Sequence, residues 1–310
     1  MIHNKRLYEI DWSSYQHAYG NAGDIPKHLT NLFSNDQEKA YAAIVRLEAS
    51  LCHQHVGVAP ALLPAFPFLI EALHELSVSE NLGYLLEMFW GVSQVTCPPD
   101  RFYSIRVLDL SWTSIPSKLS ASTESYVQEI RQQLLINRGV FTSFLNHQDD
   151  YVFDCATLIV SNFNETPVET AKELQTVLSY EANPIRRNSL FSGLRHLPFE
   201  NKLDYLTQAF HEETDIVVKS TIAGQIAYEM KTDSPSDVVA LLSAQVLGMS
   251  ETDIIVEVYS TDFFEDVGIP LALARPEKYE YILQRFINYV KHLKFINHST
   301  NFLGRWCMKI

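Results

Sequence analysis

"FLNHQDDYVFDCATL", residues 144–158, runs from the apolar end of one predicted helix, through a polar turn, into a second amphipathic helix. After the turn, Val152, Cys155, Ala156 and Ile159 recur at the three- and four-residue spacing of a helix face. Strand-like alternation elsewhere in the chain is confined to short pieces. The stretch therefore predicts a helix–turn–helix unit with its turn at Asp149.

The same pattern occurs in three other segments: "LFSNDQEKAYAAI" (32–44), "VLSYEANPIRRNSL" (177–190) and "AFHEETDIVVKSTIAGQI" (209–226). Aligning Asp36, Asp149, Asn183 and Thr214 at the turn gives separations of 113, 34 and 31 residues, and the first gap has room for further pairs. Irregular spacing of about this size is typical of HEAT-like arrays. We predict an all-α fold, a HEAT-like α-solenoid in which antiparallel helix pairs form a right-handed superhelix.

Composition is consistent with one folded domain over residues 1–310, with a long loop near 96–123. Hydrophobic residues make up 46% of the chain and charged residues 20%, and no low-complexity linker divides it. The N-terminus lacks the apolar core of an export signal, and the apolar stretch 56–73 contains three prolines, which favour a turn and a buried helix over a membrane span. We expect a cytoplasmic protein with no membrane partner.

The four cysteines lie far apart and form no C-x-x-C pair, which argues against a zinc site and against a disulfide framework. We expect reduced and mostly buried thiols at the following positions: Cys52, Cys97, Cys155 and Cys307.

Two glycines precede a predicted helix in "HAYGNAGDIPKHLTNLFSND", residues 17–36, where a phosphate-binding loop would lie. The segment has neither the preceding strand nor the lysine of such a loop. Asp24 fits an N-cap whose carboxylate accepts N–H groups of the first turn, and Pro26 fits that turn. We predict that Gly20 and Gly23 provide the dihedral angles of the loop.

The first quarter of the chain resembles the opening of a group of bacterial HEAT-repeat proteins. That group shares a tryptophan, an A-Y-G-x-A-x-D-x-P stretch, an H-Q-G loop and an A-V-P-F-L helix, and His55 stands where its loop has glycine. The resemblance implies an α-solenoid that binds another macromolecule, and some relatives resemble immunity proteins for secreted toxins. The matching residues are Trp12, Ala18, Tyr19, Gly20, Ala22, Asp24, Pro26, His53, Gln54, Pro67, Phe68 and Leu69.

Candidate catalytic residues have more ordinary interpretations. His53 and His55 could offer two imidazoles to a metal, but they lie on a loop without a nearby carboxylate or third ligand. Asp149, Asp150 and Asp154 could place carboxylates on one helix face, yet the first two start a helix, where the macrodipole favours acids. No G-x-S-x-G elbow occurs. We expect no enzymatic activity, no cofactor and no metal.

Charge indicates the class of partner. The chain has 24 basic and 37 acidic residues, and its longest positive cluster is the pair Arg186–Arg187, which argues against nucleic acid. Residues 204–266 contain thirteen acids and two bases, whereas residues 267–310 contain seven bases and two acids. The acidic stretch is either an ordinary solvated face or a surface that steers a basic partner.

Aromatic residues add two candidate contact segments. "YSTDFFEDVGIP", residues 259–270, sets two phenylalanines among acids, as interface anchors or as core residues. The long break at 96–123 contains a tyrosine and a tryptophan that could contact a partner if the loop is ordered. The predicted partner-binding residues are Glu212, Glu213, Asp215, Asp262, Phe263, Phe264, Glu265, Asp266, Tyr103 and Trp112.

The leading hypothesis is an immunity or antitoxin-like protein that neutralises a basic toxin domain, most simply a nuclease, by covering its substrate-binding surface. A general scaffold or regulatory adaptor is the second possibility. Because some HEAT-like arrays are DNA glycosylases, an enzyme of that kind is the third.

Overall fold

The computed structural model describes residues 2–52, 57–76, 80–96, 125–195, 197–247 and 269–275, together with Lys278. Helices dominate these ranges, which confirms the all-α prediction. The described strands are short: β1 (Gln16–His17) pairs antiparallel with β2 (Gly20–Asn21). The chain divides into two compact units, Met1–Phe199 and Glu200–Ile310, and a single domain over the whole chain stays a prediction.

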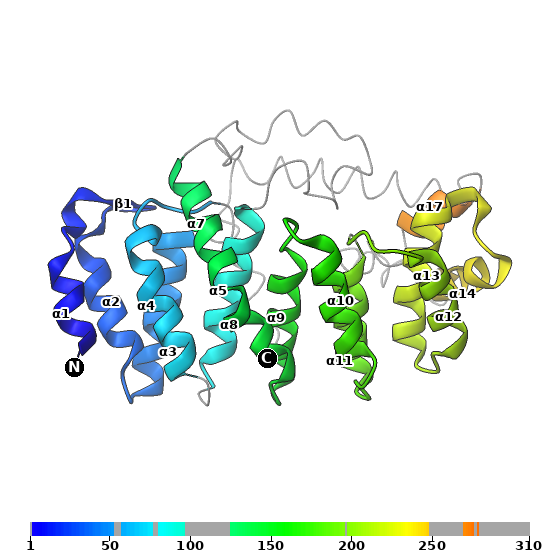
Figure 1. Ribbon diagram of the computed structural model, residues 1–310, viewed down its shortest axis with the longest axis horizontal. Coiled ribbons are helices and arrows are strands. Elements are labelled where there is room, and N and C mark those ends of the chain that lie inside the picture. The colour runs from blue at the N-terminus through cyan, green and yellow to red at the C-terminus, as the bar shows by residue number, and fades with distance from the viewer. Residues whose placement is uncertain are drawn as a thin grey trace. The chain divides into compact units, whose positions relative to one another are not determined.

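The helices of the first unit form two rows (Figure 1). In one row α3 packs against α5, α5 against α9, and α9 against α11; in the other, α2 packs against α4, α4 against α7, and α7 against α8. Contacts between α2 and α3, α4 and α5, α8 and α9, and α10 and α11 join the rows. The bounds are α1 (Ile2–Glu9), α2 (Ile25–Leu32), α3 (Gln37–Leu47), α4 (Leu62–Glu75), α5 (Leu82–Val95), α7 (Ser125–Ile136), α8 (Arg138–Ser143), α9 (Asp150–Ser161), α10 (Pro167–Leu178) and α11 (Pro184–Leu194).

A run of buried phenylalanines lies at the centre of the first unit. Phe66 on α4 meets Phe89 on α5 with ring centroids 5.4 Å apart, and Phe89 meets Phe141 on α8 at 5.2 Å. Phe141 continues the contact to Phe163 at 6.2 Å. All four rings are fully buried, so these aromatic contacts connect successive helices through the core.

An ion pair between the buried Arg131 and the exposed Glu165 helps to connect four segments of the same unit. Arg131 on α7 is 5% exposed and donates from Nε and Nη2 to the two carboxylate oxygens of Glu165, at 2.8 and 2.7 Å. Its guanidinium also donates to the carbonyl oxygens of Ser93, at the end of α5, and of Asn162, after α9. A charge buried to this degree is tolerated because it is paired and hydrogen-bonded.

Aspartate or asparagine caps start the helices at the predicted turns. Asp36 accepts from the N–H of Lys39 before α3, Asp149 accepts from Tyr151 and Val152 before α9, and Asn183 accepts from Ile185 before α11. The fourth predicted turn residue, Thr214, also lies in a turn, between α12 (Lys202–Glu212) and α13 (Ile216–Met230), where the carboxylate of the next residue, Asp215, is the N-cap.

The N-terminal entrance departs from its prediction. Asp24 precedes α2, but its side chain makes no capping hydrogen bond; Oδ1 lies 3.0 Å from Nε2 of His17, and Oδ2 lies 3.6 Å from Nε2 of His28. The β1–β2 hairpin brings His17 onto Asp24, so the carboxylate is engaged away from the first turn. Gly20 has the expected positive φ, +129°, whereas Gly23 lies in the short 3₁₀ turn Ala22–Asp24.

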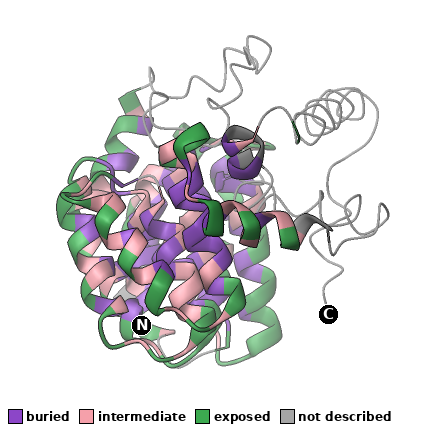
Figure 2. Cartoon of the chain, turned by 90° about the vertical axis from the view of Figure 1, so that its right-hand side faces the viewer, coloured by how far each residue is buried: buried purple, intermediate pink, exposed green. Residues whose placement is uncertain are grey.

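The second unit is built around one central helix. α13 (Ile216–Met230) packs against α12 (Lys202–Glu212), α14 (Ser236–Leu247) and α17 (Ile269–Ala274). Most of its middle, from Val218 to Ala227, is buried, and Figure 2 shows buried positions gathered where helices face one another. Over the described parts of both units, no helix is long and apolar enough to cross a membrane.

Candidate partner-binding surface

Two of the predicted binding acids fix the turn between α12 and α13. Oδ1 of Asp215 accepts the N–H groups of Val217 and Val218 at 3.0 and 3.1 Å, as an N-cap. Oε1 of Glu213 accepts the N–H groups of Thr214 and Asp215 at 2.9 and 2.8 Å. Both carboxylates therefore hold the backbone, and replacing them would alter the turn as well as its charge.

The capped first turn of α13 places two aliphatic side chains on the surface. Val218 is fully buried, so the residues before it on the helix turn outward: Ile216 is 52% exposed and Val217 is 60% exposed. Sequence analysis missed this pair. The available signal was two β-branched apolar residues directly after a cap, on a helix whose inward face is already filled by Val218 and Ile222.

Outward apolar residues occur at the same position of other capped helices. The residue two places after the cap is Tyr151 on α9, Ile185 on α11 and Val217 on α13, and each is exposed. Three capped helices in the two units therefore present an apolar side chain at this position, whereas α3, capped by Asp36, has Glu38 there.

A shallow hollow lies beside Ile216. Lys219 points into this region, where its Nζ donates to the carbonyl oxygen of Glu213 at 3.2 Å and lies 5.0 Å from the ring centroid of Phe210. Lys219 is therefore already bound to groups of this surface, the carbonyl oxygen of Glu213 and the ring of Phe210. The hollow is lined by Phe210, His211, Glu213, Thr214, Ile216, Lys219, Asp237 and Leu241.

Two exposed carboxylates lie on the elements next to the aliphatic pair: Asp237 lines the same hollow as Ile216, and Glu212 ends the preceding helix four residues before Ile216. Glu212, at the end of α12, and Asp237, in the first turn of α14, are both exposed. Residues 200–247 contain eight acidic and three basic residues, a net charge of −5. One of the bases, Lys202, pairs with Glu229 at 2.7 Å. The surface around the start of α13 is therefore apolar at its centre and acidic at its edge.

Seven of the predicted binding residues lie outside the described residues, so their placement stays a prediction. They are Tyr103, Trp112, Asp262, Phe263, Phe264, Glu265 and Asp266. The loop near 96–123, apart from Thr96, and the pair His53 and His55 also lie outside the described ranges.

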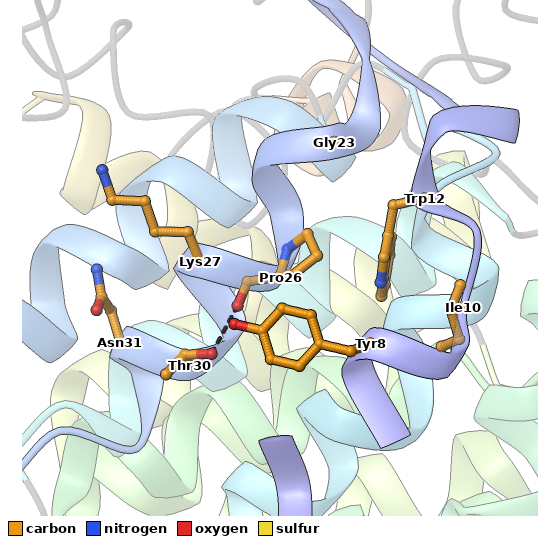
Figure 3. A pocket seen from close by; sticks show the side chains of 8 residues that line it. All are labelled: Tyr8, Ile10, Trp12, Gly23, Pro26, Lys27, Thr30 and Asn31. Carbon is orange, nitrogen blue, oxygen red and sulfur yellow. Dashed lines mark hydrogen bonds between the residues drawn. The ribbon is translucent and has the colours of Figure 1, made fainter. Parts of the chain in front are cut away.

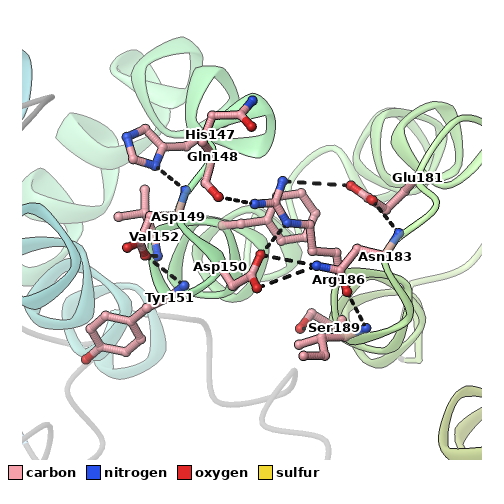
Figure 4. Close-up of polar contacts among 12 residues, drawn as sticks. His147, Gln148, Asp149, Asp150, Tyr151, Val152, Glu181, Asn183, Arg186 and Ser189 are labelled. Carbon is pink, nitrogen blue, oxygen red and sulfur yellow. Dashed lines mark hydrogen bonds and ion pairs between the residues drawn. The ribbon is translucent and has the colours of Figure 1, made fainter.

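The acids at the start of α9 have structural roles (Figure 4). Asp149 is the N-cap, and Oδ1 of Asp150 accepts from Nε of Arg186 at 2.6 Å. Arg186 also donates to the carbonyl oxygen of Gln148 and lies 4.9 Å from the ring centroid of Phe153. The interpretation of Asp149 and Asp150 as the start of a helix is confirmed. In the Arg186–Arg187 pair, Arg186 forms an ion pair with Asp150.

His17, Asp24 and His28 form the most suggestive polar cluster of the N-terminal segment. Nδ1 of His17 accepts the N–H of Tyr19 at 3.0 Å, which assigns the ring proton to Nε2, the atom that donates to Asp24. Both ring nitrogens are thus used within the chain. Burial lowers the pKa of His28, against the opposing effect of Asp24.

A second hollow lies between the end of α1 and α2 (Figure 3). Nε1 of Trp12 donates to the carbonyl oxygen of Leu7 at 2.7 Å, and Oγ1 of Thr30 donates to that of Pro26 at 2.8 Å. These polar groups are satisfied by the chain. The lining consists of Tyr8, Ile10, Trp12, Gly23, Pro26, Lys27, Thr30 and Asn31.

The cysteine prediction is confirmed for the two described thiols. Cys52 and Cys155 are free and buried, and burial raises the pKa of Cys155. A raised pKa favours the unreactive thiol form. Cys97 and Cys307 lie outside the described residues.

Comparison with known proteins assigns no family. No protein-family model, curated protein or solved structure matches the chain. Within the described ranges, no group of three or more histidine, cysteine, aspartate or glutamate side chains is arranged to hold a metal ion.

Proposed function

We propose that this chain is a protein-binding α-solenoid, a right-handed superhelix of HEAT-like helix pairs. The two rows of helices in the first unit support this arrangement, because each helix packs against the next helix of its own row, as in an array of stacked helix pairs. The capped starts of α3, α9, α11 and α13 support a repeated unit that continues into the second unit.

The partner that fits the candidate surface is a basic protein. The observation that carries this proposal is the exposed pair Ile216 and Val217, bordered by the exposed carboxylates of Glu212 and Asp237. Apolar side chains within a polar rim are typical of interface anchors. Exposed acids accelerate the approach of a basic protein and disfavour acidic competitors.

The role that we propose is that of an immunity or antitoxin-like protein without enzymatic activity. Its target would be a basic toxin domain, most simply a nuclease. Surfaces that bind nucleic acid are rich in lysine and arginine, so an acidic surface is complementary to them and would exclude the substrate.

The proposal can be tested by affinity purification from the native host followed by quantitative mass spectrometry. The wild-type chain is compared with Ile216→Ser/Val217→Ser and with the control Val168→Ser, which changes a β-branched residue of similar exposure (57%) on α10. We expect a basic protein to be enriched by the wild type and the control and lost from the double variant. Equal recovery by all three chains, or an acidic partner, would contradict the proposal.

The captured partner then separates the two binding roles. If the partner is a toxin, adding the purified chain should abolish its toxic activity, for example cleavage of nucleic acid. A partner whose activity is unchanged would indicate a scaffold or adaptor and would reject the immunity role.

A further inference from the structure

Three exposed tyrosines form a continuous ladder across the first unit. The ring centroids of Tyr41 on α3 and Tyr84 on α5 are 4.9 Å apart, and those of Tyr84 and Tyr151 on α9 are 5.9 Å apart. Both pairs meet edge to face, at interplanar angles of 63° and 69°. Each residue is 42–43% exposed, so the rings contact one another and the solvent rather than fill the core.

The position of Tyr151 is specified by its surroundings. Its hydroxyl donates to Oε2 of Glu87 at 2.5 Å. Gly83 makes room for the ring, because a Cβ atom at this position would overlap the carbon atoms of Tyr151. Burial and the hydrogen bond to Glu87 both raise the pKa of Tyr151, consistent with a phenol that stays a donor. The ladder is therefore a preorganised surface.

Of the three helices beneath the ladder, α5 and α9 carry only negative charge, whereas α3 carries Glu38, Lys39 and Arg46. Glu87 is the one charged residue of α5, and Asp150 and Asp154 are those of α9. Asp150 pairs with Arg186, whereas Oε1 of Glu87 accepts no hydrogen bond from any described residue. Carboxylates next to aromatic rings create a site that attracts cations and repels phosphate groups.

We propose that the ladder Tyr41–Tyr84–Tyr151, with Glu87 and Asp154, is a docking strip for an extended lysine- or arginine-bearing segment of a protein. Tyrosine faces attract ammonium and guanidinium groups, and guanidinium also stacks on them. Alternate side chains of an extended segment are about 6.6 Å apart, close to the step between neighbouring rings. Nucleic acids and anionic membranes would be repelled by the carboxylates.

This inference rests on the proposed function, because it assumes a basic partner, and it adds a second contact surface in a different unit. The proposal for the tyrosine strip and the proposal for the surface at the start of α13 can be rejected independently of each other. The strip is tested with a peptide that needs no knowledge of the native partner, whereas the surface at the start of α13 is tested by partner recovery.

The experiment measures fluorescence anisotropy of a labelled peptide in which arginine and serine alternate. Peptides that alternate glutamate or glycine with serine serve as comparisons. We expect the arginine peptide to bind the wild-type chain, more weakly as salt increases, and the other two not to bind. Tyr84→Ala should weaken binding about two- to fivefold, the loss of one exposed cation–π contact.

Matched variants distinguish binding at the strip from binding elsewhere on the protein surface. Tyr84→Phe keeps the ring and should bind like the wild type. Glu87→Gln keeps a hydrogen-bond acceptor for Tyr151 and should bind more weakly, with less dependence on salt. Tyr180→Ala removes a tyrosine that is 60% exposed but contacts Asn146 instead of the ladder, and should leave binding unchanged. Circular dichroism confirms that each variant is folded.

Three results would overturn the inference: no binding of the arginine peptide, equal loss in Tyr84→Ala and Tyr180→Ala, or equal binding of the glycine peptide. Val217→Ser, which alters the surface at the start of α13, should leave peptide binding unchanged. If that variant abolishes peptide binding while Tyr84→Ala does not, the strip is rejected and the proposed function is retained.

Discussion

Helices α9 and α13 begin with the same backbone arrangement, but they present different side chains. In each, an aspartate accepts the N–H groups of the second and third helical residues, and the residue two places after the aspartate is exposed. Tyr151 on α9 is fixed by Glu87 and Gly83 of the neighbouring helix, whereas the hydrogen bond from the N–H of Val217 to Asp215 lies within its own turn. A repeated helix start can therefore serve either an aromatic surface supported by other helices or an aliphatic surface supported by its cap.

The difference in support predicts that the first unit is the more sensitive to loss of a single long-range contact. Arg131→Ala should lower the free energy of unfolding by about 1–3 kcal/mol, because the carbonyl oxygens of Ser93 and Asn162 lose their buried donor, whereas the carboxylate of Glu165 keeps access to water. Chemical denaturation followed by circular dichroism measures the change. Arg131→Met, which restores apolar volume, should cost less than Arg131→Ala; a loss below 1 kcal/mol in both variants would show that the ion pair contributes little.

The aromatic surface should also respond to a single added methyl group. Glycine to alanine within a helix ordinarily stabilises, but Gly83→Ala should cost about 1–3 kcal/mol because the new Cβ overlaps the ring of Tyr151. The control is Gly139→Ala on α8, where a Cβ meets nothing within 4 Å and should stabilise by about 0.4–1 kcal/mol. If both substitutions stabilise, the ring of Tyr151 is not held where the structure places it.

The two caps should be equivalent, since each carboxylate accepts two N–H groups. Asp149→Ala and Asp215→Ala should each lower stability by about 0.5–2 kcal/mol in the same denaturation experiment. Glu212→Ala, which changes an exposed acid outside the cap, is the control and should have almost no effect. If one substitution leaves the free energy of unfolding unchanged and the other lowers it strongly, the two helix starts are not equivalent.

The smallest expected effect on stability is at the aliphatic surface. Val217→Ser should change the free energy of unfolding by no more than about 0.5 kcal/mol, because the side chain is 60% exposed. Its effect should appear in the dissociation rate of the captured partner, which should rise, as expected for an anchor. A stability loss comparable to that of the caps would mean that Val217 is structural and not part of a binding surface.

Local features of the fold could be predicted from the sequence. Asp36, Asp149 and Asn183 were identified as turn residues because a cap and an apolar helical period lie within a few residues of one another. Thr214 was placed in the correct turn, but the residue that caps α13 is its neighbour Asp215. The capping role predicted for Asp24 was wrong because the β1–β2 hairpin brings His17 to its carboxylate, and the sequence did not predict these two-residue strands.

The contacts that define the surfaces could not be predicted in the same way. Tyr41, Tyr84 and Tyr151 belong to three helices separated by irregular intervals, so their common edge follows from packing and not from spacing. Charge counting did locate the acidic segment, but it assigned Glu213 and Asp215 to binding, whereas they also hold the turn. Net charge identifies the class of partner more readily than the residues that contact it.

We propose that the aliphatic pair at the start of α13 retains a basic partner and that the surrounding acids attract it. Surface-plasmon kinetics with the captured partner tests this proposal most directly, using Glu212→Gln/Asp237→Asn and Ile216→Ser/Val217→Ser at low and physiological ionic strength. We predict that the first variant slows association at low salt and leaves dissociation unchanged, because exposed charges act on approach and are screened over about 8–10 Å. The second should speed dissociation and leave association unchanged. Rates equal to those of the wild type in both variants would contradict the account.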